Sequence, residues 1–140
     1  MNKSVIQQKL EQLKTYVDAL QPFSQLTLAD YLSDELRQRA IERRLQLCTQ
    51  LCLEIATELV AHYGLPGSER PEELFIALGR EDKIPSLLAQ RLANMMRFRA
   101  HLLHDTDTDP LKVHAVLVNS LDVFPTFSMT VRMLVEEEPD

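Results

Sequence analysis

Apolar residues recur at steps of three and four along most of the chain, and this spacing is the strongest constraint on its fold. The first run comprises Ile6, Leu10, Leu13, Val17 and Leu20. Steps of this size place side chains on one face of an α-helix, whereas a half-buried strand alternates apolar and polar residues. Strand-like alternation is almost absent, so the sequence predicts an all-α protein.

Turn-forming residues divide this pattern into separate helices. A long helix is expected from near Ser33 to Gly64, with apolar stripes on more than one side and hence partners on two faces. Gly64 suits the left-handed residue after a helix, and the proline two residues later forbids continuation. Pro71 suits the first turn of a short helix that ends at Gly79.

Two further helices follow. Pro85 opens one that runs to about His104, and Asp109-Pro110 is a strong start for the next, with Asp as the N-cap. Pro125 is expected to kink or split that last helix. The sequence therefore predicts an antiparallel bundle of four to five helices.

Bulk properties indicate one domain over residues 1–140, with an acidic tail, 135–140, that is expected to fray. A net charge of -6 argues against non-specific nucleic-acid binding by the whole surface. No apolar run is long enough to span a membrane, and the N-terminus lacks a secretory signal. Cys48 and Cys52 complete no zinc set and are interpreted as small buried apolar residues. We therefore expect a cytoplasmic protein.

The acidic chain nevertheless carries concentrated positive charge. From Lys83 to His104 there is no acidic residue, and the segment "RFRAHLLHDTDTDP" (97–110) contains two arginines and two histidines. A second group, "RQRAIERR" (37–44), lies near the start of the long helix. Such patches can hold phosphate groups, or they can form a solvated face that pairs with neighbouring carboxylates.

Helical geometry constrains how these residues could cooperate. Arg99 and His104 are five positions apart, so an unbroken helix would separate them by about 140° of arc, whereas Arg97 and His104 lie nearly in line. For Arg99 to act with His104, the helix should loosen or end near Leu103. Alternatively, the two could meet across a symmetric dimer interface.

An arginine and a histidine suffice for one reaction without a metal or a cofactor. The 2′-hydroxyl of RNA is a built-in nucleophile, and a histidine can accept its proton or donate one to the leaving oxygen. An arginine can stabilise the charge that develops on phosphorus. The plainer alternative is structural, since a histidine is also favoured at a helix C-terminus by the helix dipole.

The segment from Tyr31 to about Phe124 resembles the HepT-like branch of the HEPN superfamily. The matching stretches are "AIERRLQLCTQLCLEIA", the Gly-Leu-Pro turn, "EELFIAL", and "LANMMRFR" leading to "HLLHD". The family hallmark is an arginine, four to six residues, and a histidine. Arg99 and His104, here called the Arg–His motif, fit with four residues between them, and Arg97 fits with six.

The resemblance implies a homodimer whose two motifs face one cleft. It also implies an endoribonuclease, acting on tRNA or mRNA, that is the toxin of a toxin–antitoxin pair. The implied partner is an MNT-type nucleotidyltransferase, which in this family can silence the toxin by transferring AMP to a tyrosine two residues after the motif histidine. No membrane association is expected.

Two residues depart from the family pattern. Ala100 replaces the usual polar residue after the arginine, and Thr106 stands where the acceptor tyrosine is expected, which makes Thr106 the candidate modification site. These changes favour an alternative function, a catalytically silent bundle that binds a nucleotidyltransferase or a nucleotide.

Three neighbours of the motif are candidates for contact with RNA phosphates: Arg97, His101 and Asp105. Asp105 could instead orient His104 or cap the next turn. His101, His104 and Asp105 form an incomplete metal-ligand set, so no metal site is predicted.

Overall fold

A computed structural model of the protein describes residues 1–104 and 108–139, and within them every regular element is a helix. The all-α fold class is therefore confirmed. The elements are α1 (Lys3–Leu20), the short 3-10 helix η1 (Gln21–Gln25), α2 (Leu28–Leu32), α3 (Glu35–His62), α4 (Pro71–Arg80), α5 (Ser86–His104), α6 (Pro110–Asn119) and α7 (Val123–Glu137).

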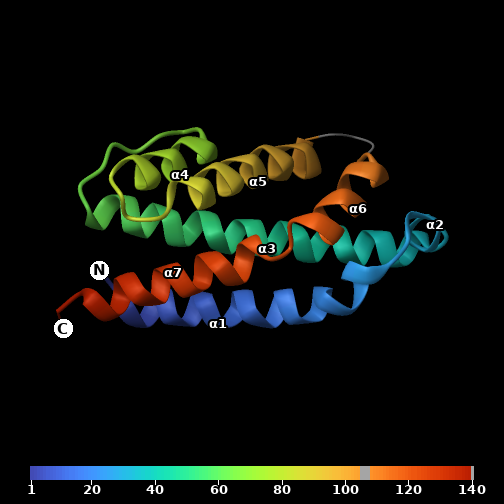
Figure 1. Cartoon of the computed structure of the whole chain (residues 1–140), viewed down its shortest axis with the longest axis horizontal. Coiled ribbons are helices and arrows are strands. Elements are labelled where there is room, and N and C mark those ends of the chain that lie inside the picture. Colours follow the sequence, from blue (N-terminus) through green and yellow to red (C-terminus); the bar gives the residue numbers. More distant parts are fainter. Residues whose placement is uncertain (105–107, 140) are drawn as a thin grey trace.

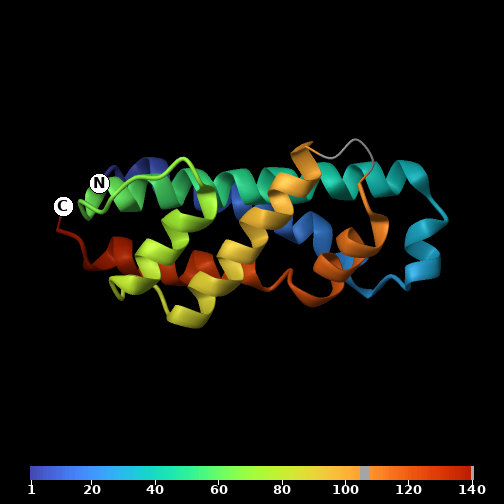
Figure 2. The same ribbon diagram turned by 90° about the horizontal axis from the view of Figure 1, so that it is seen from above.

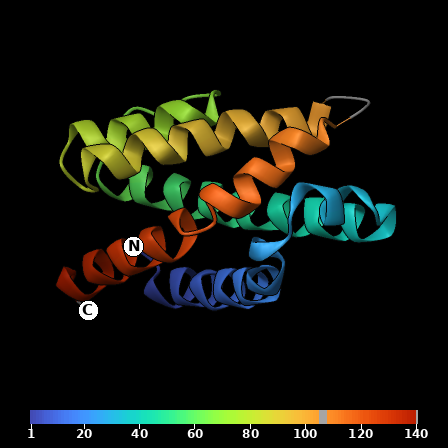
Figure 3. The ribbon, with the colours of Figure 1, turned by 45° about the vertical axis from the view of Figure 1, so that its right-hand side comes forward.

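The long helix α3 is the axis of the bundle. Figure 1 shows α1 and α7 on one side of α3 and the α4–α5 hairpin on the other. Helix α6 crosses from the end of α5 towards the start of α7, as Figure 3 shows from another side. Helix α3 contacts α1, α4, α5 and α7, which confirms the prediction of partners on two faces.

Local capping signals place the helix ends at or next to the residues that the sequence predicts. The Asp34 side chain accepts a hydrogen bond from the Arg37 amide at 3.1 Å and begins α3. Gly64 has φ of 67°, the left-handed value that ends a helix at low cost to glycine. The Asp109 side chain accepts from the Leu111 amide at 3.0 Å and begins α6.

The chain forms more helices than the four to five expected. The predicted split near Pro125 occurs before it, where α6 ends at Asn119 and α7 begins at Val123. Pro125 thus lies in the first turn of α7, where a missing N–H removes no helical hydrogen bond. The short η1 and α2 helices were not predicted; the N-cap of α2 is Thr27, whose hydroxyl accepts from the Asp30 amide at 3.1 Å.

The tail expected to fray is ordered through residue 138. Helix α7 continues to Glu137, and Val135 is buried against the core. The Glu138 carboxylate pairs with the His62 ring at 3.0 Å, and Lys3 donates to the Glu138 carbonyl. These contacts hold the C-terminal end of α7 against the start of α1 and the end of α3. The two ends of the chain lie close together in Figure 2. Fraying of the tail stays a prediction, and these contacts argue against it for residues 135–138.

The interior contains both cysteines without a disulfide. Cys48 and Cys52 are fully buried and unpaired, which confirms their interpretation as small apolar residues. Burial raises the pKa of the Cys48 thiol to about 12, so the thiolate does not form at neutral pH. In the described part of the chain, no helix is both long and apolar enough to cross a membrane.

Candidate functional site

Arg99 occupies a position on α5 that would normally belong to the core. It follows Leu88 and Leu92 on the same face of the helix and is itself half-buried. Its Nη2 donates a hydrogen bond to the side-chain oxygen of Gln50 on α3. Its Nε is buried and has no hydrogen-bond partner among the described residues. Burial lowers the pKa of this guanidinium, although an arginine still remains charged at neutral pH.

His104 is the last residue of α5, and its side chain is exposed. Helix α5 ends at His104, next to the end expected near Leu103, and it does not loosen between Arg99 and His104. The unbroken helix therefore separates Arg99 and His104 by about 140° around its axis. Within one chain, Arg99 faces α3 while His104 faces outward.

Arg97 shares the outer face of α5 with His104. The two are seven positions apart, nearly in line on a helix, and both are exposed. Arg97 donates to the side-chain oxygen of Asn94 at 2.7 Å, which steadies the guanidinium without neutralising it. Arg97 is thus accessible, and its contact with RNA phosphate stays a prediction.

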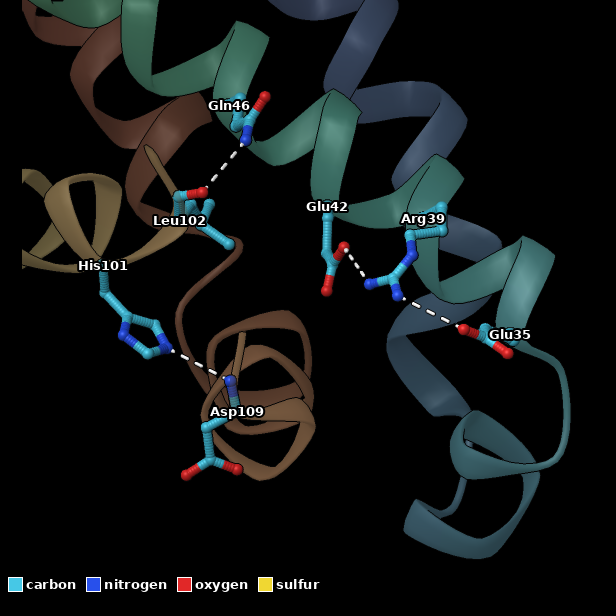
Figure 4. A network of polar contacts seen from close by, with 7 residues as sticks. All are labelled: Glu35, Arg39, Glu42, Gln46, His101, Leu102 and Asp109. Atoms are coloured by element: carbon cyan, nitrogen blue, oxygen red, sulfur yellow. Dashed lines mark hydrogen bonds and ion pairs between the residues drawn. The ribbon is translucent and has the colours of Figure 1, made fainter. Parts of the chain in front are cut away.

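His101 connects the end of α5 to the start of α6. Its Nε2 accepts a hydrogen bond from the Asp109 amide at 3.3 Å, as Figure 4 shows. Accepting at Nε2 requires the neutral ring with its proton on Nδ1. The ring also lies near Phe98, with 6.4 Å between ring centroids. His101 therefore has a structural role here, and its predicted role with phosphate stays a prediction.

Two of the predicted site residues, Asp105 and Thr106, lie outside the described residues, so their roles also stay predictions. Ala100 is exposed and brings no polar side chain to the site. Over residues 1–104 and 108–139, no three His, Cys, Asp or Glu side chains gather as metal ligands.

Helix α3 lines the motif with two glutamines that the sequence analysis missed. Gln46 donates from its amide nitrogen to the Leu102 carbonyl at 3.4 Å (Figure 4), and Gln50 accepts from Arg99. Their spacing of four on a helix shows that they share a face. Which helix that face meets depends on tertiary packing, so the sequence alone did not indicate their role.

In the second cationic group, residues 37–44, one arginine forms ion pairs and others have neutral partners. Arg39 lies between Glu35 and Glu42, at 3.2 and 3.4 Å (Figure 4), and Arg37 donates to the Asp30 carbonyl at 2.5 Å. Arg43 is exposed and donates only to Gln46, at 3.4 Å. For Arg39, therefore, the carboxylate-pairing alternative is the correct one.

Comparisons with known proteins agree on one family. A family model described as ribonuclease HepT-like matches residues 6–131. A protein of Aphanizomenon flos-aquae (strain 2012/KM1/D3), named tRNA nuclease HepT, is 31% identical over 140 residues, which cover 97% of this chain and 95% of that protein.

Solved structures share the fold at lower identity. One is a tri-AMPylated Shewanella oneidensis HEPN toxin in complex with an MNT antitoxin, with a TM-score of 0.84 and 22% identity over 95% of this chain and 99% of that one. Another is a toxin–antitoxin complex with AMP-PNP, with a TM-score of 0.83 and 21% identity over 93% of this chain and 98% of that one. At such identities the likeness establishes the helical fold.

Proposed function

This chain belongs to the ribonuclease HepT-like family, and we propose on that basis that it is the endoribonuclease toxin of a toxin–antitoxin pair, cleaving RNA in the cytoplasm without a metal ion. The curated relative is named a tRNA nuclease, which makes tRNA the first substrate to test. The single observation that carries the chemistry is a half-buried arginine whose described hydrogen-bond partner is a neutral amide, on the same helix as an exposed histidine.

Each motif residue has a definite task in this reaction. The His104 imidazole accepts the proton of a ribose 2′-hydroxyl, whose oxygen attacks the adjacent phosphorus. The Arg99 guanidinium stabilises the negative charge that builds on the phosphoryl oxygens, which it can do because none of the described carboxylates pairs with it. A water molecule protonates the leaving 5′-oxygen, and the His104 imidazolium gives its proton to the hydroxide that remains. The products carry a 2′,3′-cyclic phosphate and a 5′-hydroxyl.

Two copies of the chain would complete the site. Arg99 and His104 lie about 140° apart on an unbroken α5. One phosphodiester of RNA is therefore contacted more easily by Arg99 of one copy and His104 of the other. Exposed apolar side chains near the motif suit such a contact, because Leu103 and Leu111 are 44% and 54% exposed. A homodimer with a shared cleft is therefore part of the proposal.

The direct test is cleavage in the presence of chelator. Purified protein is incubated with tRNA and with mRNA in EDTA, beside His104→Ala. We expect cleavage by the parent alone, with cyclic phosphate at the new ends. Activity that disappears with EDTA and returns with a divalent ion would contradict the Arg–His mechanism.

The proposed partner is an MNT-type nucleotidyltransferase antitoxin. A related HEPN toxin was solved in complex with such a protein, and that toxin was AMPylated. Thr106 is the candidate acceptor, through attack of its hydroxyl on the α-phosphate of ATP with release of pyrophosphate. Mass spectrometry after incubation with the partner and ATP tests this, with an added AMP expected in the parent and none in Thr106→Ala.

A catalytically silent bundle is the second candidate, and Ala100 favours it. This side chain offers no hydrogen bond to phosphate or to His104. Binding of the nucleotidyltransferase without cleavage of any RNA by the parent would support this candidate over the enzyme.

A further inference from the structure

The Arg–His motif is held from one side by α3, through contacts that its own helix cannot make. We propose that Gln50 and Gln46 are positioning residues for the motif: Gln50 directs the Arg99 guanidinium, and Gln46 fixes the last turn of α5, which carries His104. This inference rests on the proposed ribonuclease function and assigns new residues to its site.

Gln50 is suited to orient a cation that must remain available. Its side-chain oxygen accepts from Nη2 of Arg99, while Nε of Arg99 is enclosed by protein without a partner. These two constraints fix the plane of the guanidinium. A glutamate in place of Gln50 would form an ion pair and compete with phosphate, whereas the neutral amide holds the group and leaves its charge to the substrate.

Gln46 acts on the backbone of the same helix end. The Leu102 carbonyl is one of the last four carbonyls of α5, which lack an intrahelical partner. The Gln46 amide donates to it at 3.4 Å, two residues before His104. This contact fixes the position of the last turn of α5 along the axis of α3.

The two contacts form a matched pair. Gln46 and Gln50 are one turn apart on α3, and their partners Leu102 and Arg99 are about one turn apart on α5, in the opposite direction. The antiparallel register of the two helices therefore presents both amides to the motif at once. On the other side of α5, His101 holds the start of α6 through the Asp109 amide.

Two substitutions of Gln50 separate positioning from simple support. Gln50→Met keeps the volume and removes the acceptor, and we expect kcat for RNA cleavage to fall about 10- to 100-fold with little change in KM. Gln50→Glu keeps the acceptor and adds charge, and we expect unchanged or higher thermal stability but a similar loss of activity. If the contact between Gln50 and Arg99 only supports the fold, Gln50→Glu should keep full activity, because an ion pair with Arg99 would support the fold at least as well.

Gln46 is tested against a matched glutamine on the same helix. Gln38 also donates to the carbonyl of a helix-terminal residue, Leu32 of α2, at 3.3 Å, but it lies about three turns before Gln50 on α3 and contacts α2 rather than α5. We expect Gln46→Met to lower kcat about 10-fold, and Gln38→Met to leave it within about twofold. Equal effects in the two variants would overturn the role of Gln46.

An activity-independent measurement distinguishes failure of this inference from failure of the ribonuclease proposal. Nitrogen-15 NMR of arginine side chains reports rotation of the Arg99 guanidinium. Slow rotation in the parent and fast rotation in Gln50→Met support positioning even if the parent cleaves no RNA. Identical rotation in both proteins overturns it, whatever the activity.

Discussion

Two arginines on α5 meet opposite kinds of partner. Arg91 forms a two-pronged ion pair with Asp122, with nitrogen–oxygen distances of 3.1 and 2.6 Å. Arg99, about two turns further along, contacts the neutral amide of Gln50. The first arginine joins α5 to the start of α7 and its charge is cancelled. The second keeps its charge, which is what a site for an anion requires.

The same difference separates α1 from the end of α5. On α1, Lys9 pairs with the Glu54 carboxylate at 3.5 Å and Lys14 with the Asp18 carboxylate at 2.6 Å. At the end of α5, Arg97 and Arg99 meet the amides of Asn94 and Gln50. Natural proteins break local rules of charge pairing mainly at functional sites, so this contrast supports the proposed site at the end of α5.

Removing the Arg99 guanidinium should have the largest effect. In Arg99→Ala we expect RNA cleavage to fall about 10²- to 10³-fold, because the charge that stabilises the phosphoryl oxygens is lost. The measurement is kcat/KM on tRNA, with Arg91→Ala as the matched control on the same helix. Comparable losses in the two variants would remove the distinction between the paired and the unpaired arginine.

A change in packing far from the motif should lower stability without lowering activity. A Cβ on Gly79 would lie 2.6 Å from the Cβ of Ala89, so Gly79→Ala forces α4 and α5 apart. We expect a loss of about 1–3 kcal/mol, partly offset by better helix propensity. Thermal unfolding measures it, and cleavage at 25 °C should remain near the parent value.

Gly67→Ala is the control, since nothing lies within 4 Å of its added Cβ. If Gly79→Ala loses cleavage activity at 25 °C as well as thermal stability, activity would depend only on the fraction of folded protein, and the predicted separation of stability from activity would be contradicted.

The Arg91–Asp122 pair should have the smallest effect, confined to stability and dependent on pH. The Arg91 guanidinium, through its hydrogen bonds, lowers the pKa of Asp122 below its ordinary value. A lowered folded-state pKa stabilises the protein above the unfolded-state pKa, and this contribution is lost as pH falls through the folded-state pKa.

Because the pair is partly exposed, we expect Arg91→Ala to lose about 0.5–1 kcal/mol, or about 2–4 °C in Tm, at pH 7. The difference from the parent should shrink towards zero as the pH falls below 3.8, the ordinary pKa of an aspartate, and then through the lower folded-state pKa of Asp122. Calorimetry at pH 7 and over a descending acid series checks this, and a constant difference would assign the effect to packing of the arginine stem.

Local chemistry made much of the fold predictable from sequence. The cap at Asp109 and the left-handed Gly64 depend on a few neighbouring residues, and the structure has both where the sequence predicts them. Helix α3 begins at Glu35, close to the start expected near Ser33. Contacts between distant segments were not predictable in this way. Glu138 and its partner His62 are far apart in sequence, so composition alone suggested a frayed tail.

The candidate site was predictable in part for the same reason. The motif itself is local in sequence, and its resemblance to a family named Arg99 and His104. The supporting residues Gln46 and Gln50 depend on the register of α3 against α5, which periodicity does not specify. One indication was available, since Arg99 continues the apolar stripe of Leu88 and Leu92. A charge at a core position is a reason to look for a function.

The most direct test of a site shared between two chains is complementation between two inactive variants. Arg99→Ala and His104→Ala are unfolded together, refolded as a mixture, and assayed on tRNA in EDTA. If Arg99 of one copy acts with His104 of the other, each mixed dimer contains one intact pair, and about a quarter of the parent activity should return. A mixture that forms dimers yet remains as inactive as either variant alone would contradict the shared site.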